Sequence, residues 1–181
     1  MKVPALRRKL AFDERFLRDV GLFNGTWSAF DIISDYAVGQ FLGLPHEITH
    51  LLTAGLEFHR KARLLRELIQ RSDHTKKKDL LTALNVLQNE GKRNVFAHSF
   101  MRSRDDRVTF VERTRHGPLQ AKEHHFTGPE FQAHVLKVVE AANTFQLALG
   151  VTSQHLEEFG AAFKRAASSE STSPQPPVSS E

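Results

Sequence analysis

Apolar residues recur at spacings of three and four along most of this chain, and no other feature constrains its fold as strongly. Such a period covers one face of an amphipathic helix. It predicts helices over 13–41, 47–70, 73–98 and 128–149, followed by a shorter one over 154–166. The first stripe consists of Phe16, Val20, Phe23, Trp27, Phe30, Ile33, Ala37 and Phe41, and the second includes Ile48, Leu52, Ala62, Leu65 and Ile69.

The period changes after Phe100. Residues 108–114 and 119–126 flank Arg115-His116-Gly117-Pro118, which predicts a β-hairpin or a long, partly extended loop. We therefore expect an all-α fold: an up-down helical bundle of four to five helices, with a small β-hairpin insert between the third and fourth helices. The bundle should cover 13–167, after a basic lead-in over 1–12 and before a Ser/Pro-rich disordered tail over 168–181.

Composition excludes several classes of protein. The 181 residues contain no Cys, which rules out disulfide scaffolds and thiolate metal sites and suits a reducing, cytoplasmic location. No stretch reaches the roughly 18 apolar residues of a membrane span. There is no P-loop, dinucleotide fingerprint or serine nucleophile elbow, so we expect no cofactor. The formal charge of +4 weakly favours phosphate-bearing partners.

The densest group of chemically useful residues is Arg93-Asn94-Val95-Phe96-Ala97-His98. It resembles the signature of HEPN domains, small helical bundles in which Arg and a polar residue, often Asn, precede a His four to six residues further on. The surroundings agree in order: a helix reading EFHRKARLLRELI, a basic linker, the motif helix, a hairpin-like insert and a closing helix. The resemblance covers roughly residues 13–150.

The resemblance implies metal-independent RNA cleavage by a homodimer whose two motifs face one cleft, with 2′,3′-cyclic phosphate products. Arg93 would bind the scissile phosphate, Asn94 would orient nearby groups, and His98 would move the proton of the 2′-hydroxyl or of the leaving oxygen. A toxin or a stress or defence nuclease would act in this way, with an antitoxin or other regulatory protein as a further partner.

The residue types suit that chemistry. The unperturbed pKa of His lies near neutrality, and the fork of an Arg matches phosphate oxygens. On a straight helix, however, about 140° of rotation separates Arg93 from His98. Either Arg93 reaches around its own helix, or the chain dimerises and Arg93 of one chain completes the site of the other.

Other basic residues extend this hypothesis. Lys61 lies in the second helix, and Arg102, Arg104 and Arg107 lie near the hairpin, where they are candidates for RNA binding. Two simpler interpretations stay open: Lys61 lays its stem along the edge of the core, and nearby acids cancel the charge of a plain solvated hairpin.

Two alternatives compete with a ribonuclease. The first is a non-catalytic HEPN-like module that binds RNA, a nucleotide or a protein partner, since Asn94 and His98 also continue an apolar stripe on which a buried His would lie. The second is a zinc peptidase, because His46-Glu47-Ile48-Thr49-His50 matches H-E-x-x-H. Pro45 places His46 in the first helical turn, and no third ligand has a familiar spacing.

Overall fold

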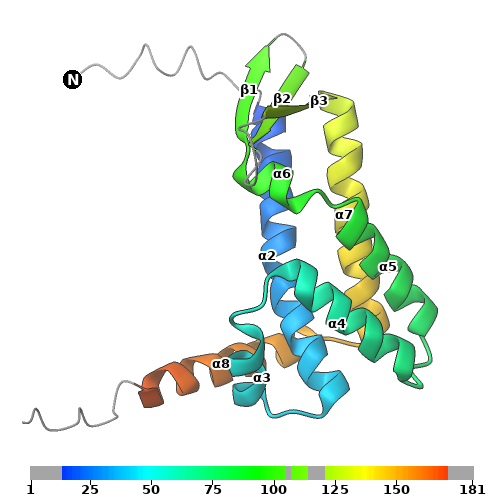
Figure 1. The fold of residues 1–181 in the computed structure, drawn as a ribbon, viewed down its shortest axis with the longest axis vertical. Coiled ribbons are helices and arrows are strands. Elements are labelled where there is room, and N and C mark those ends of the chain that lie inside the picture. The colour runs from blue at the N-terminus through cyan, green and yellow to red at the C-terminus, as the bar shows by residue number, and fades with distance from the viewer. Residues whose placement is uncertain (1–13, 105–106, 114–120, 171–181) are drawn as a thin grey trace, which may run out of the picture. The chain divides into compact units, whose positions relative to one another are not determined.

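The computed structural model describes the backbone of residues 14–104, 107–113 and 121–170 (Figure 1). Helices dominate it. The helices are α2 (Glu14–Leu42), α3 (His46–Thr53), α4 (Phe58–Arg71), α5 (Lys77–Asn89), α6 (Arg93–His98), α7 (Gly128–Leu149) and α8 (Ser153–Glu170), and the strands are β1 (Phe100–Arg104), β2 (Arg107–Arg113) and β3 (Ala121–Thr127). The predicted lead-in over 1–12 lies outside the described residues. No helix in the described ranges is long and apolar enough to cross a membrane.

The described chain divides into two compact units. The first contains residues 14–30 and 78–145, and the second contains 31–77 and 146–170. Both α2 and α7 contribute one part to each unit. The first unit therefore holds α6 and the sheet, whereas the second holds α3, α4 and α8.

Aromatic side chains form the core of the first unit. The aromatic residues of the predicted α2 stripe up to Phe30 are buried here, and their rings meet rings from β2, α6 and α7. Edge-to-face and tilted pairs of this kind add stability beyond the area that they bury. The buried aromatic residues are Phe16, Phe23, Trp27, Phe30, Phe96, Phe110, Phe131 and Phe145.

The predicted hairpin is part of a larger sheet. β2 and β3 pair antiparallel as predicted, with Val108 opposite Phe126, and their connection over 114–120 lies outside the described residues. β1 is an additional strand, paired with β2 so that Phe100 lies opposite Val111. The sheet has the order β1-β2-β3 and lies in the chain between α6 and α7. The mostly helical prediction is confirmed, but the strand content is larger than predicted.

The predicted second helix is two helices. α3 ends at Thr53 and α4 begins at Phe58, with Gly55 exposed between them. This break separates α3 from the apolar stripe of α4, so the prediction that Ile48 and Leu52 are buried is wrong: they are 49% and 46% exposed. Thr49 and Thr53 are buried in their place.

A glycine in α2 makes room for one of these buried threonines in the second unit. A Cβ at Gly39 of α2 would lie 2.3 Å from Oγ1 of Thr49, so the two helices can approach this closely only at a glycine. Each buried hydroxyl donates to a backbone carbonyl one turn earlier, Thr49 to Pro45 and Thr53 to Thr49. The threonines therefore pack without leaving a polar group unsatisfied.

The first closing helix has its predicted bounds, whereas the second is longer than predicted. α7 follows Thr127, the predicted N-cap. α8 continues to Glu170, so the predicted tail does not begin at residue 168, and its remainder, 171–181, lies outside the described residues.

A capping box starts α7 beside the sheet. The backbone amide of Glu130 donates to Oγ1 of Thr127 at 3.4 Å, and the amide of Thr127 donates to Oε2 of Glu130 at 2.7 Å. Thr127→Ala should cost about 1 kcal/mol in the free energy of unfolding, because a helix-terminal amide loses its acceptor. Urea unfolding followed by circular dichroism measures this. Thr144→Ala, an exposed change inside α7, should cost nothing; equal losses would contradict the cap.

Candidate functional site

An abrupt turn before residue 93 separates the motif from α5. α5 ends at Asn89, and Lys92 adopts a left-handed conformation with φ 47° and ψ 34°. A Cβ at Gly91 would lie 2.5 Å from the carbonyl oxygen of Leu87 and 2.5 Å from Cζ2 of Trp27, so only glycine fits there. The predicted continuous helix over 73–98 is therefore wrong, and the stripe from Leu80 does not run on to His98.

The motif forms a helix of its own, α6, which is anchored through its middle. Val95 is 7% exposed and Phe96 is 5% exposed. The Phe96 ring lies 4.6 Å from the ring centre of Phe110 and 4.9 Å from that of Phe23, both edge-on. These contacts hold α6 against β2 and α2 within the first unit.

Arg93, Asn94 and His98 all lie in this six-residue helix. Arg93 is half-buried in its first turn, while the side chains of Asn94 and His98 are outside what the structure describes. Helix geometry gives a rise of about 7.5 Å and a rotation of about 140° between residues 93 and 98. The three predicted catalytic residues thus share one short element, and the rotation that separates Arg93 from His98 on the helix remains.

His134 of α7 is a neighbour of the motif that the sequence did not single out. Its ring lies 5.0 Å from that of Phe96 and close to the backbone of Gly91. Burial lowers the pKa of His134, the backbone of Gly91 acts in the opposite direction, and nearby Lys92 and Lys137 lower it further. A neutral His134 therefore helps to hold the turn before α6. In the sequence, the spacing of three residues between Phe131 and His134 could have indicated that His134 lies on the buried face of this helix.

Contacts of the residues on either side of Gly91 also stabilise this turn. The Lys92 ammonium lies 5.4 Å from the centre of the Phe126 ring in β3, within the range of a cation–π contact. Lys137 of α7 forms an ion pair with Glu90 at the end of α5. Both sides of the Gly91 turn are thereby attached to elements of the first unit.

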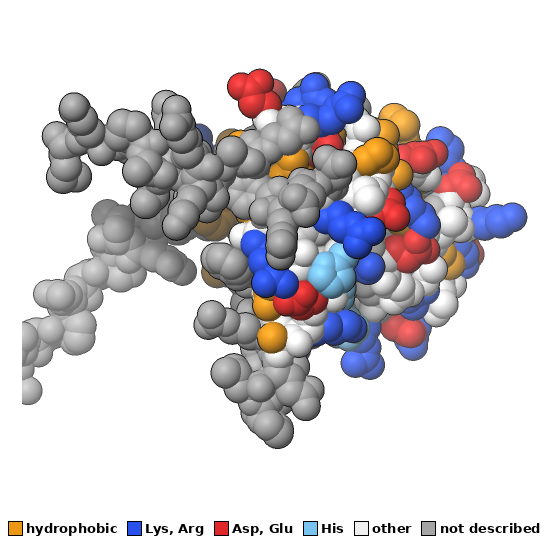
Figure 2. Space-filling model, turned by 90° about the horizontal axis from the view of Figure 1, so that it is seen from above, with side chains coloured by type: hydrophobic (Ala, Val, Ile, Leu, Met, Phe, Trp, Pro, Cys, Tyr) orange, Lys and Arg blue, Asp and Glu red, His pale blue; other side chains and the backbone are white. Residues whose placement is uncertain are grey.

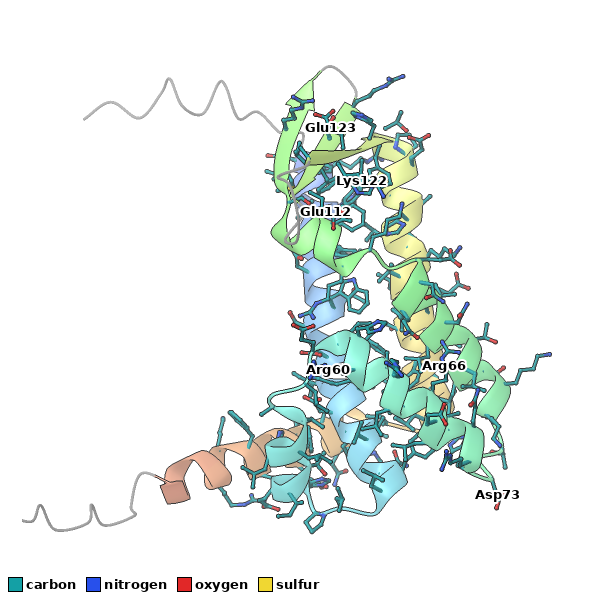
Figure 3. The ribbon with its side chains drawn as sticks, in the orientation of Figure 1. Arg60, Arg66, Asp73, Glu112, Lys122 and Glu123 are labelled. Carbon is teal, nitrogen blue, oxygen red and sulfur yellow. The ribbon has the colours of Figure 1, made fainter. Side chains whose placement is uncertain are left out.

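Nearby carboxylates partly neutralise the charge of the predicted RNA-binding arginines of the sheet. Arg102 donates to Oε1 of Glu123 at 2.7 Å. The pKa of Glu130 is lowered mainly by its hydrogen bonds with Thr127, and exposed Arg107 adds a smaller electrostatic contribution. The side chain of Arg104 is outside the described part of the chain. Figure 3 labels Glu112, Lys122 and Glu123 on the sheet. In Figure 2, where the molecule is seen from above, basic and acidic side chains lie beside one another.

Lys61 requires a correction. It is 4% exposed, and its ammonium lies 2.9 Å from Oδ1 of Asp31 and 2.7 Å from Oδ1 of Asp35, both in α2. Two carboxylates thus already engage the charge that was predicted to meet a phosphate. Burial raises the pKa of Asp35, although Lys61 acts against that rise. Lys61 belongs to a buried ion cluster of the second unit.

The H-E-x-x-H residues join α3 to α8. His50 lies stacked 3.8 Å from the Phe159 ring, and its Nε2 is 2.9 Å from the Phe159 carbonyl oxygen. Arg165 donates to Glu47, whose pKa is lowered by a hydrogen bond from its own backbone and by Arg165. A carboxylate of lowered pKa is a poor general base. Among the described residues, no three His, Asp or Glu side chains gather as a metal site would require.

Comparison of the chain with protein-family models, curated proteins and solved structures gives no match. The likeness to HEPN domains therefore rests on residues 93–98 and on the order of the elements around them.

Proposed function

We propose that this chain is a metal-independent endoribonuclease of HEPN type that acts as a homodimer. The observation that carries the proposal is the separate helix α6, which holds Arg93 and His98 within six residues and is anchored through Val95 and Phe96. Catalytic groups on a rigid element keep their geometry better than groups on a loop. An antitoxin or another regulatory protein fits this activity as a further partner.

The proposed reaction needs only these side chains and the RNA. The 2′-hydroxyl oxygen attacks the adjacent phosphorus, and the bond from phosphorus to the 5′-oxygen breaks, leaving a 2′,3′-cyclic phosphate and a 5′-hydroxyl. His98 takes the proton from the attacking hydroxyl or gives one to the leaving oxygen. Arg93 neutralises the charge that develops on the phosphate oxygens, and Asn94 orients groups nearby.

A cleavage assay in EDTA tests the activity. Wild-type protein should convert a labelled RNA hairpin into fragments that end in cyclic phosphate, and His98→Ala should reduce the rate by about 10²–10⁴-fold. Arg93→Ala should reduce it by a comparable factor. His59→Ala and Arg71→Ala, exposed changes in α4, are matched controls that should cleave normally. Intact RNA with wild-type protein would reject the ribonuclease and leave a binding module.

Mixing two inactive variants tests the shared site. If Arg93 of one protomer serves His98 of the other, a heterodimer of Arg93→Ala and His98→Ala has one complete site and one empty one. Random exchange of subunits should then restore about a quarter of wild-type activity. No recovery, with exchange verified by native mass spectrometry, would contradict a site shared between protomers.

A further inference from the structure

The outward side of α4 carries arginines at every third position. Its inward side is formed by Lys61, Ala62, Leu65 and Ile69, all buried. Arg60 and Arg63 are exposed and Arg66 is half-buried, at successive spacings of three. Figure 3 labels Arg60 and Arg66 along this helix. The helix thus separates a buried stripe from a basic one.

These arginines border a hollow. It has a volume of about 470 Å³ and is lined by Arg60, Arg63, Leu64, Arg66 and Glu67. Exposed Arg60 and Arg63 bring two positive charges to this hollow, against the one negative charge of Glu67. Glu67 also lies 3.5 Å from Arg71, outside the hollow, so its charge is shared. On the sheet, by contrast, Glu123 already holds Arg102 at 2.7 Å.

The shape and charge of this α4 hollow suit a chain of phosphates. An Arg fork binds two phosphate oxygens at once. The rise from Arg60 to Arg63 is about 4.5 Å, so the forks of these two side chains can reach neighbouring phosphates of one strand. Leu64 adds an apolar surface for a ribose or a base. A row of charges spaced in this way favours a polyanion over a single small anion.

We propose that the α4 hollow binds the phosphodiester backbone of a single-stranded nucleic acid. That the strand is RNA rests on the proposed function. Arg60 and Arg63 contact successive phosphates, Leu64 packs on the sugar or base between them, and Glu67 opposes binding. This site replaces Lys61, whose charge is buried, as the binding surface of α4.

Fluorescence anisotropy with labelled oligouridylate over a series of KCl concentrations tests the site. The Arg60→Ala/Arg63→Ala variant should bind about tenfold more weakly or worse, and the slope of log affinity against log salt should fall by about 1.4, or about 0.7 per lost phosphate contact. Glu67→Gln should bind about two- to threefold more tightly, because it removes the repulsion. Lys76→Ala/Lys78→Ala, which also removes two exposed positive charges but lies outside the hollow, is the matched control and should keep the wild-type affinity.

Binding and cleavage are measured separately. The His98→Ala chain should bind the oligonucleotide with full affinity, and adding Arg60→Ala/Arg63→Ala to it should weaken binding. If this happens while wild-type protein cleaves nothing, the ribonuclease fails and the α4 site stands. Unchanged affinity or salt slope in Arg60→Ala/Arg63→Ala would overturn the site. Competition with polyglutamate of equal charge is a second test of the site. If polyglutamate displaces the oligonucleotide as well as oligothymidylate does, the site is overturned, because the hollow would then bind any polyanion.

Discussion

Replacing Lys61 with methionine should destabilise the protein by about 2–4 kcal/mol at neutral pH, because the change leaves two aspartates facing each other without their cation. The Asp31 side chain is 36% exposed and that of Asp35 is 18% exposed. Because water screens the more exposed Asp31, the loss can be as small as the lower end of this range. Methionine keeps the length of the buried stem, so loss of charge dominates. Urea unfolding followed by circular dichroism gives the change in the free energy of unfolding.

The pH dependence of this loss of stability tests whether the missing charge causes it. Burial already raises the pKa of Asp35 above its usual value of 3.8, and removing Lys61 takes away an interaction that opposes the rise. The folded state then binds a proton more readily than the unfolded state, so stability increases as the pH falls from the folded pKa toward the unfolded one. The deficit of Lys61→Met should therefore be largest at neutral pH and shrink toward pH 4.

A second change supplies the control. Lys61→Met/Asp35→Asn removes a buried carboxylate together with its cation and should recover at least half of the lost stability, since a pair costs less to remove than one partner. A deficit that stayed the same at acidic pH and in the double variant would mean that Lys61 acts through volume rather than charge. The charge cluster would then not be what joins α2 to α4.

The sequence predicts the helical stripes well because their period reports burial directly. Phe16, Phe23 and Phe30 are buried as predicted, and so are Leu65 and Ile69. The N-cap at Thr127 was also predictable, since the hydroxyl, the acidic residue three positions later and Pro129 are all local features. Local rules succeed where the deciding contacts lie within a few residues.

The ends of helices inside a stripe were not predictable in this way. The break after Thr53 interrupts a stripe whose spacing alone favours continuity. The role of Lys61 depends on Asp31 and Asp35, one turn apart on another helix, and a side chain's type does not reveal which partners it will meet. Such contacts come from tertiary structure, which overrides local preference.

The candidate site shows the same difference between what local sequence predicts and what tertiary contacts decide. Its residues were named from the motif, yet the isolation of α6 depends on Trp27, far away in the sequence, filling the space beside Gly91. The His134 ring completes the turn from α7. Sequence reasoning therefore names candidate residues for the site, but not the contacts that orient their helix.

Gly91→Ala should consequently be among the most damaging single changes near the site. The added Cβ would lie 2.5 Å from a backbone oxygen and from the Trp27 ring, and neither can yield without moving α5 or the core. We expect a loss of about 2–3 kcal/mol in the free energy of unfolding. Trp27 is the chain's single tryptophan, so its fluorescence reports on the altered contact directly.

Gly25→Ala is the matched control, because no atom within 4 Å would meet its Cβ in α2 and alanine favours a helix. It should stabilise the protein by about 0.5–1 kcal/mol and leave Trp27 emission unchanged. Hydrogen exchange in Gly91→Ala should accelerate over residues 91–98 more than over α2, because the turn that orients α6 is lost. Wild-type stability and emission in Gly91→Ala would show that α6 does not depend on this contact, and RNA cleavage should then survive the change. If the contact orients α6, cleavage should fall even at temperatures where the protein remains folded, since Arg93 and His98 move together with that helix.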